Sequence, residues 1–388
     1  MTRTAYTGAR IFDGEKWWDN SALVVNDALI EGIIAADSPT DAQRVPMGGG
    51  ILAPGFIDLQ VNGGGGVQLN LAPTLDSIRT ICATYARFGT TACLPTLITD
   101  TREVNAAAIA AGEAAVRENV PGFLGMHLEG PHLSLARKGA HDPALIRPMD
   151  EADLVALIEA RRRLPHLIST VAAETVTPNQ ITRLAGAGIV VSIGHSDASY
   201  ATVRAAAEAG ATMVTHLFNA QSQLGNREPG VVGAALDLGT LSAGLIADGI
   251  HVNPTSIGVA LRAKQGPGRI FLVTDAMAPT GTDEATFELT GRTVYRKDGA
   301  LRLADGTLAG ADLTMIDAVT YMHRTLGLPL EEALRMAALY PAEALGVADE
   351  RGRIAPGLRA DLVHLGEDLA VRGTLIGGET AWTVETAS

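Results

Sequence analysis

Between residues 55 and 275, short apolar runs alternate with alanine-rich amphipathic segments, and no other feature of the sequence restricts the fold as strongly. Apolar runs of this length that end at Gly or Pro are typical of buried strands, whereas apolar residues at helical spacing predict helices. Eight runs with helices between them predict an α/β fold, namely a TIM-like (β/α)8 barrel. The predicted strands are 55–60, 90–97, 122–129, 167–173, 188–195, 212–218, 241–248 and 269–275. The predicted helices are 74–88, 102–117, 150–163, 178–187, 198–209 and 253–264.

A doubly wound open sheet is the alternative for such an alternation. That fold usually carries a GxGxxG turn between its first strand and its first helix. Here the glycine run 63–66 has no helix directly behind it and no Lys-Ser/Thr pair after it. The run therefore favours a mobile loop at an active site over a phosphate-binding turn.

The two ends of the chain have a different pattern from its middle. Residues 1–52 and 353–388 contain short runs typical of strands, separated by turn signals such as Asp13-Gly14. They predict a small β-sandwich domain assembled from both termini, with a catalytic barrel over 53–352 inserted between its halves. Residues 283–308 predict a β-hairpin insertion in the barrel, and helices over 313–326 and 330–338 would close it.

Composition and charge exclude several classes of partner. The chain has 30 Lys and Arg against 43 Asp and Glu, for a formal charge of −13, and it contains no basic tract. This balance argues against nucleic acid or an anionic membrane as a partner. Cys82 and Cys93 lack metal-ligand spacing, and we expect no disulfide framework. With neither a signal peptide nor a membrane-spanning stretch in the sequence, we predict a cytoplasmic protein.

Four of the apolar runs end in a residue that can bind a metal ion or move a proton. These residues are Glu129, His195, His216 and Asp275. A single histidine at a strand end is usually structural, and an isolated buried carboxylate is very unfavourable. In a (β/α)8 barrel, however, the carboxyl ends of all strands meet at one rim, where the catalytic groups lie. We therefore expect the four residues to form one site.

The residue types of this site indicate hydrolysis assisted by a metal ion. Glu129, His195 and His216 match the three protein ligands of a catalytic zinc site, so we predict one divalent ion per subunit, with Zn²⁺ as the best match. Asp275 is then placed as the general acid and base. The sequence shows no competing Ser-His-Asp set or nucleophilic cysteine.

Several short blocks of sequence, taken in order, carry a family resemblance. They are HLEGP (127–131), KGAH (138–141), GHS (194–196), THLFNA (215–220), REPG (227–230), ADGIHV (247–252), VTDAMAP (273–279) and LTMIDAV (313–319). PGFIDLQVNGGGG (54–66) precedes them, and LYPAEALG with GRIAPGLRADLV (339–363) follows. No single block is specific, but the ordered set closely resembles the N-acetylglucosamine-6-phosphate deacetylases, a family of the amidohydrolase superfamily.

The resemblance implies that a phosphorylated amino sugar is hydrolysed to the free amine and acetate. It assigns metal binding to the positions of Glu129, His195 and His216, and the acid–base role to Asp275. Many amidohydrolases carry a His-x-His pair on the first strand for a second metal, but here that segment reads Gln60-Val61-Asn62. Amides are poor ligands beside imidazoles, so we expect one ion, with Gln60 as a neighbour of the water at the metal.

The resemblance also implies how the substrate is held. It assigns His141 to polarising the acetamide carbonyl in an oxyanion-hole role, which makes it the second catalytic residue beside Asp275. In the family, the arginine that holds the 6-phosphate reaches into the site of a neighbouring subunit, which implies a homodimer. The positions assigned to substrate binding are Ala140, Asn219, Ala220, Arg227 and His251.

Two positions depart from the family pattern, and three other functions stay open. His132 stands where members often carry a bulky aromatic or apolar residue, and Ala311-Asp312 replaces a common serine pair. The open alternatives are deacetylation of the galactosamine epimer, hydrolysis of another N-acyl substrate, and an inactive barrel kept as a scaffold. A purified protein with neither a divalent metal nor acetate release would favour the scaffold.

Overall fold

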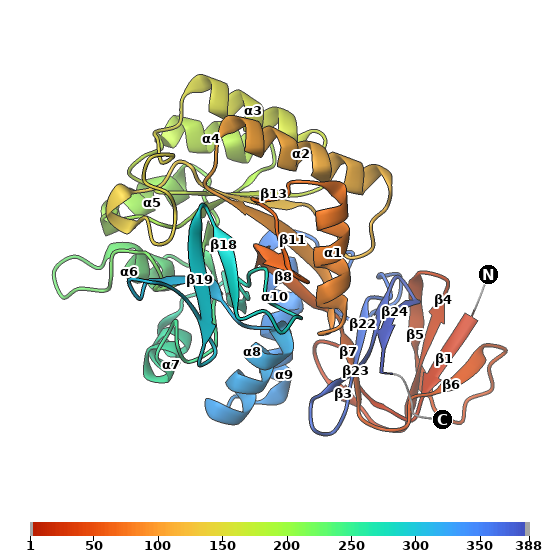
Figure 1. Ribbon diagram of the computed structural model, residues 1–388. Coiled ribbons are helices and arrows are strands. Elements are labelled where there is room, and N and C mark those ends of the chain that lie inside the picture. The colour runs from red at the N-terminus through yellow and green to blue at the C-terminus, as the bar shows by residue number, and fades with distance from the viewer. Residues whose placement is uncertain (1–2, 385–388) are drawn as a thin grey trace.

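Eight parallel strands form the central sheet of the computed structural model, which describes residues 3–384 (Figure 1). They lie side by side in chain order. The strands are β8 (Phe56–Val61), β11 (Thr90–Ile98), β12 (Met126–Glu129), β13 (Leu167–Val171), β14 (Val190–Ile193), β15 (Met213–Val214), β16 (Ser242–Leu245) and β17 (Ile270–Leu272). The first and last strands meet at the carboxyl rim, where the Asp275 amide donates to the Gln60 carbonyl (3.0 Å) and the Asn62 amide to the Ala276 carbonyl (2.8 Å). The predicted barrel class is confirmed.

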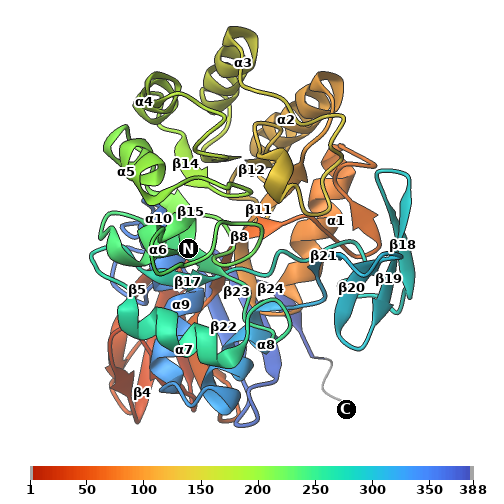
Figure 2. The ribbon, with the colours of Figure 1, turned by 90° about the vertical axis from the view of Figure 1, so that its left-hand side faces the viewer.

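Helices surround this barrel, as Figure 2 shows. Of the helices within residues 75–263, six begin after a Thr, Ser, Asp or Asn whose side chain accepts a backbone N–H of the first turn, which explains where each of these helices starts. These are α1 (Leu75–Ala86), α2 (Arg102–Arg117), α3 (Glu151–Arg161), α4 (Pro178–Gly186), α5 (Tyr200–Glu208) and α7 (Pro254–Ala263). A further helix that the sequence pattern did not predict, α6 (Gly230–Asp237), begins after Pro229 without a side-chain cap. Within residues 3–384, no helix is long and apolar enough to cross a membrane.

A chain of hydrogen bonds crosses the interior of the barrel. His127 Nδ1 lies 3.0 Å from the Leu59 carbonyl oxygen, so Nδ1 donates and Nε2 is left to accept. The Thr170 hydroxyl lies 2.7 Å from His127 Nε2 and 2.7 Å from the Thr215 hydroxyl, which is itself 2.6 Å from Ser192 Oγ. Burial lowers the pKa of His127 to about 4, which keeps its imidazole neutral. His127 is therefore a residue of the barrel interior.

Strands from both ends of the chain build two further sheets beside the barrel (Figure 1). One sheet has the order β5-β4-β1-β6 and the other β24-β23-β22-β7-β2-β3, so strands from the carboxyl end join strands from the amino end where β22 pairs with β7. Apolar side chains of both sheets share one core, to which Leu23, Ile11 and Leu362 belong. This arrangement is the predicted small sandwich, although the domain bounds at 52/53 and 352/353 remain predictions. The strands are β1 (Arg3–Thr7), β2 (Arg10–Phe12), β3 (Trp17–Trp18), β4 (Ser21–Asn26), β5 (Leu29–Ala35), β6 (Gln43–Pro46), β7 (Ile51–Pro54), β22 (Leu362–Leu365), β23 (Val371–Ile376) and β24 (Glu379–Thr383).

The segment after β17 contains more structure than one hairpin. It forms a four-stranded antiparallel sheet, with β18 (Thr286–Leu289), β19 (Arg292–Lys297), β20 (Ala300–Leu303) and β21 (Leu308–Ala311) in chain order. Its apolar side, which includes Leu289 and Leu301, packs against Met277, which follows the last barrel strand in the chain. Three helices follow: α8 (Met315–Thr320), α9 (Leu330–Ala337) and α10 (Leu339–Leu345).

The hydrogen-bond chain inside the barrel makes a stability prediction. The substitution Thr170→Val keeps the shape of the side chain but leaves His127 Nε2 and the Thr215 hydroxyl without this partner. We expect the free energy of unfolding to fall by about 1–3 kcal/mol, as is usual when a buried polar group loses its hydrogen bond. Urea denaturation measures the change, and the matched control is Thr286→Val on the exposed strand β18, for which we expect no such loss. Equal midpoints for the two variants would contradict the importance of the internal chain.

Candidate active site

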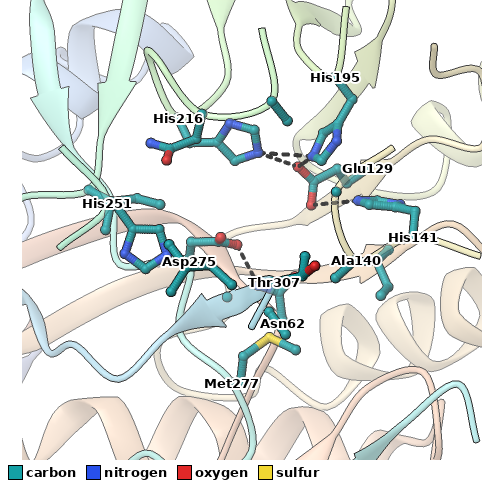
Figure 3. Close-up of a pocket in the computed structure, with 18 of the residues that line it drawn as sticks. Asn62, Glu129, Ala140, His141, His195, His216, His251, Asp275, Met277 and Thr307 are labelled. Atoms are coloured by element: carbon teal, nitrogen blue, oxygen red, sulfur yellow. Dashed lines mark hydrogen bonds and ion pairs between the residues drawn. The ribbon is translucent and has the colours of Figure 1, made fainter. Parts of the chain in front are cut away.

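Four polar residues predicted to lie at strand ends meet in one cavity of about 500 Å³ at the carboxyl rim of the barrel (Figure 3). Glu129 is the last residue of β12. His195 and His216 each follow the end of their strand, β14 or β15, by two residues, and Asp275 follows β17 by three. The barrel therefore brings these four side chains together from its third, fifth, sixth and eighth strands.

The backbone is strained at three of these four positions. The φ angle is +46° at His195, +29° at His216 and +53° at Asp275, in the left-handed region that residues other than glycine rarely adopt. Conformations of this kind cost on the order of 1–3 kcal/mol each and concentrate at functional sites. The strain turns each chain segment sharply just beyond its strand, which is also why β14 and β15 end earlier than their apolar patterns predict.

Glu129, His195 and His216 form a compact triangle of ligand atoms. Glu129 Oε1 lies 3.2 Å from His195 Nε2 and 3.0 Å from His216 Nε2, and the two nitrogens are 3.0 Å apart. A point about 2.0–2.1 Å from all three atoms lies roughly 1 Å outside their plane, and these are the ligand distances of zinc. The donor set and its geometry therefore fit a single divalent ion.

Electrostatics within this triangle point the same way. Burial by itself raises the pKa of the Glu129 carboxyl, but hydrogen bonds and positive charge from His195 and His216 outweigh it and hold that pKa well below its usual value. Although burial disfavours the charged imidazole, the contact with Glu129 raises the pKa of His216. The carboxylate thus needs a cation beside it, and a bound metal ion would replace the proton in that place.

His141 lies on the other side of Glu129 and forms an alternative triplet with Glu129 and His195, whose ligand atoms are all within 4.8 Å of one another. Its protonation argues against metal binding. Nδ1 accepts the Thr99 backbone N–H (3.3 Å) and lies 2.7 Å from the Thr99 hydroxyl, so the proton of the neutral ring sits on Nε2. Burial and the neighbouring His195 lower the pKa of His141 to about 3. The ring therefore presents an N–H donor to the cavity, 4.0 Å from Glu129 Oε2, and His216 is the better third ligand.

A hydrogen bond from Nδ1 also fixes the orientation of the His195 ring. Its Nδ1 donates to the Arg137 carbonyl oxygen (2.8 Å), so in the neutral ring the lone pair is on Nε2, the atom that faces Glu129. Such partners set the tautomer of metal-binding histidines. His216 Nδ1, in contrast, is buried without a hydrogen-bond partner among the described residues.

Asp275 lies at the opposite edge of the same cavity. Its Oδ1 accepts the side-chain amides of Asn62 (2.6 Å) and Gln60 (3.0 Å). Burial and the negative charge of Glu129 raise the pKa of Asp275 to about 6, so the carboxyl group gains and loses its proton close to neutral pH. A carboxyl group in this state is suited to take up and release a proton.

Most of the residues assigned to substrate binding also line the cavity. Ala140, Asn219, Ala220 and His251 lie on its wall. His251 Nδ1 donates to Asp248 Oδ2 (2.6 Å), which orients the ring toward the cavity. Arg227 does not reach the cavity of its own chain, because it lies in an exposed loop before α6.

The sequence pattern missed a second part of the wall. Residues 306–310, at the turn into β21, line the cavity together with Met277, and Figure 3 shows Thr307 and Met277 among the residues of its wall. No local motif marks this segment, because only the packing of the four-stranded insertion against the rim brings it there. Thr99, which sets the tautomer of His141, was also missed for lack of a local signal.

The two departures from the family pattern lie outside the metal triangle. His132 is buried, and its Nδ1 donates to the Arg147 carbonyl oxygen (3.1 Å), so it takes part in packing. Ala311 is the last residue of β21, and Asp312 pairs with Arg296 (2.7 Å).

Comparison with known proteins gives matches over the whole chain. The Amidohydrolase family matches residues 51–381. N-acetylgalactosamine-6-phosphate deacetylase of Shewanella sp. (strain ANA-3) is 43% identical over 383 residues, which cover 98% of this chain and 96% of that protein. N-acetylglucosamine-6-phosphate deacetylase of Haemophilus influenzae is 36% identical over 362 residues, which cover 92% and 94% of the two chains. The crystal structure of N-acetylglucosamine-6-phosphate deacetylase from Pasteurella multocida is similar with a TM-score of 0.93 and 36% identity, and the match covers 97% of this chain and 99% of that one.

Proposed function

The chain belongs to the amidohydrolase family, and from that premise we propose that it hydrolyses N-acetyl-D-glucosamine 6-phosphate to D-glucosamine 6-phosphate and acetate, in the breakdown or recycling of amino sugars. One observation carries the proposal. The cavity holds three potential metal ligands, a neutral N–H donor and a carboxyl group with a raised pKa, in a chain similar over its full length to deacetylases of this kind.

Glu129, His195 and His216 are the ligands that we propose for one divalent ion per subunit, and their two nitrogens and one oxygen favour Zn²⁺. Such an ion supplies a Lewis acid that polarises a carbonyl and makes water acidic enough to attack at neutral pH. Gln60 and Asn62 occupy the positions of the His-x-His pair in two-metal relatives. Neither side chain has an imidazole nitrogen to offer a second ion, and the NH₂ groups of both amides face carboxylates.

The remaining groups of the cavity can complete the reaction. The Nε2–H of His141 is placed to donate to the acetamide oxygen as negative charge develops on it. Asp275 takes the proton from the attacking water and passes it to the nitrogen of the sugar as the C–N bond breaks. One C–O bond forms, one C–N bond breaks, and the products are acetate and the amine.

For the 6-phosphate we propose binding by His251, by the main chain at Asn219 and Ala220, and by Arg227 of a second subunit. The exposed loop position of Arg227 supports this assignment, because its side chain does not reach its own cavity. A planar guanidinium binds phosphate oxygens in a bidentate manner. The proposal therefore includes a homodimer.

The galactosamine epimer is the second candidate substrate. It is favoured by the relative from Shewanella, which is named for N-acetylgalactosamine 6-phosphate and is 43% identical to this chain. The two sugars differ only in the configuration at C4, so the same metal, base and carbonyl contacts serve both.

A substrate panel tests the proposed function. We expect acetate release from N-acetylglucosamine 6-phosphate to exceed release from the galactosamine and mannosamine epimers and from the unphosphorylated sugar. We also expect close to one divalent ion per chain in the same sample. Enzymatic acetate determination and elemental analysis are the measurements. Faster release from the galactosamine epimer would replace the first candidate by the second, and no release from any member of the panel would refute the deacetylase.

Because Asp275 and the metal ligands have different proposed roles, substitutions at Asp275 and at Glu129 should cause different defects. Asp275→Asn should keep the ion but lower kcat by about 10²–10⁴, the usual contribution of a general acid–base residue. Glu129→Gln should lose the ion as well, because the cluster then lacks its only carboxylate. Elemental analysis and kcat separate the two variants, and Asp298→Asn in the exposed turn before β20 is the control. Near-normal turnover by Asp275→Asn would eliminate the acid–base assignment.

The phosphate contact predicts a selective effect of Arg227→Ala. KM should rise by about tenfold or more for the 6-phosphate sugar, since a charge-assisted hydrogen bond is lost. KM for the unphosphorylated sugar should hardly change. Steady-state kinetics on both substrates measure the difference, and mixing Arg227→Ala with Asp275→Asn should restore part of the activity if the arginine acts across a dimer. Equal effects on both substrates would remove Arg227 from the phosphate site.

A further inference from the structure

Two amide side chains at the end of β8 converge on Asp275. Asn62 Nδ2 lies 2.6 Å and Gln60 Nε2 lies 3.0 Å from Asp275 Oδ1, and Gln60 Nε2 also lies 3.2 Å from Glu129 Oε1. Both amides are buried, with 1% of Asn62 and 2% of Gln60 exposed. In Figure 3, Asn62 lies below Asp275, on the side away from His216.

The chemistry of the partners fixes which atom of each amide faces Asp275. A carboxylate only accepts hydrogen bonds, so the NH₂ groups must face it. The NH₂ group of Gln60 has two hydrogens and can therefore serve Asp275 and Glu129 together, whereas a neutral imidazole has one N–H. Gln60 thus holds two carboxylates side by side, and neither amide adds a charge.

Both donors contact the same oxygen of Asp275. Among residues 3–384, no protein donor bonds to Oδ2, so the second oxygen remains for a proton or a ligand in the cavity. To exchange the two oxygens, the carboxylate would have to break both bonds to Oδ1, and hydrogen bonds to a charged group are stronger than those between neutral groups. The two amides therefore fix the rotation of the carboxylate.

The NH₂ group of Asn62 has a hydrogen-bond partner, whereas its oxygen has none among the described residues. This oxygen, Oδ1, is also buried. A buried carbonyl oxygen without a hydrogen-bond partner destabilises the folded protein. The side chain is thus held at a site that satisfies only its NH₂ group, and that group faces Asp275.

We propose that Gln60 and Asn62 are positioning residues of the reaction, which act through Asp275 by keeping Oδ2 aimed at the reacting amide. This proposal rests on the proposed function, since it needs Asp275 to move a proton. It assigns Gln60 to holding the carboxylates of Asp275 and Glu129. From the sequence, in contrast, this residue is expected to lie next to the water at the metal.

The test uses Asn62→Ala and Gln60→Leu, measured in the full-length enzyme. We expect kcat to fall by about 10–100-fold, in line with the effect of misplacing a catalytic group by about 1 Å, while KM changes by less than about threefold. The divalent metal content per chain should stay at the wild-type value. Unchanged kcat, or a loss that appears in KM or in metal content, would overturn the positioning role.

A double-mutant comparison separates positioning from general structural damage. If Asn62 acts through Asp275, Asn62→Ala should lower kcat by less than about twofold in an Asp275→Asn background, because the orientation of the base no longer matters there. The same fold-loss in both backgrounds would contradict the proposal. If Asn62→Ala fails to fold, Asn62→Ser is measured in its place.

The control is Asn105→Ala in α2. Asn105 is a partly buried asparagine that does not line the cavity, and its amide donates to the carbonyl oxygens of Thr101 (2.8 Å) and Asp100 (3.3 Å). We expect this variant to be less stable but to keep kcat. The wild type in the same assay tests the proposed function: no acetate release would refute the deacetylase, whereas an active wild type with unaffected variants would refute only the positioning role.

Discussion

The buried carboxylate of Glu129 is the constraint on which the rest of the structure depends. An isolated charge at this depth would be very unfavourable, so it has to be met by cations or donors from other strands. His195, His216 and Gln60 meet it within 3.2 Å. Because they come from three other strands or strand ends, they reach Glu129 only if the sheet closes, as it does between β8 and β17. Closure of the barrel and assembly of the site are therefore one structural event.

The left-handed backbone at His195, His216 and Asp275 shows that the geometry of the site depends on the surrounding fold. Each strained turn has to be held by the structure around it, since none would persist in a free chain. The hydrogen-bonded chain from His127 to Ser192 lies inside the same strands, and the helices pack their apolar faces on the outside. A rigid barrel thus supports the strained rim, where the proposed active site lies.

The sequence predicted those parts of the protein that follow from local pattern and strand topology. The barrel, the order of its strands and the meeting of Glu129, His195, His216 and Asp275 all follow from apolar runs that end in polar residues. The contact of Thr99 with His141 joins residues 42 positions apart, and that of Gln60 with Asp275 joins residues 215 positions apart, so no local signal carries either. The insertion was predicted only as a hairpin over 283–308, because its full extent and place are decided by packing, and α6 was missed because it starts without a capping side chain.

The choice of amides beside Asp275 agrees with the role of a base. An arginine or lysine in their place would also orient the carboxylate, but a cation at that distance lowers the pKa of a carboxyl group by about 1–3 units and weakens it as a proton acceptor. Amide groups orient through their dipoles and keep their hydrogens at every pH, so they neither compete for the proton nor change charge. Burial and Glu129 can then keep the pKa of Asp275 at about 6, near the pH at which a base has to exchange its proton. The pair at positions 60 and 62 thus gives Asp275 a fixed direction, and the lowering of its pKa by the hydrogen bond from Asn62 is outweighed by burial and by Glu129.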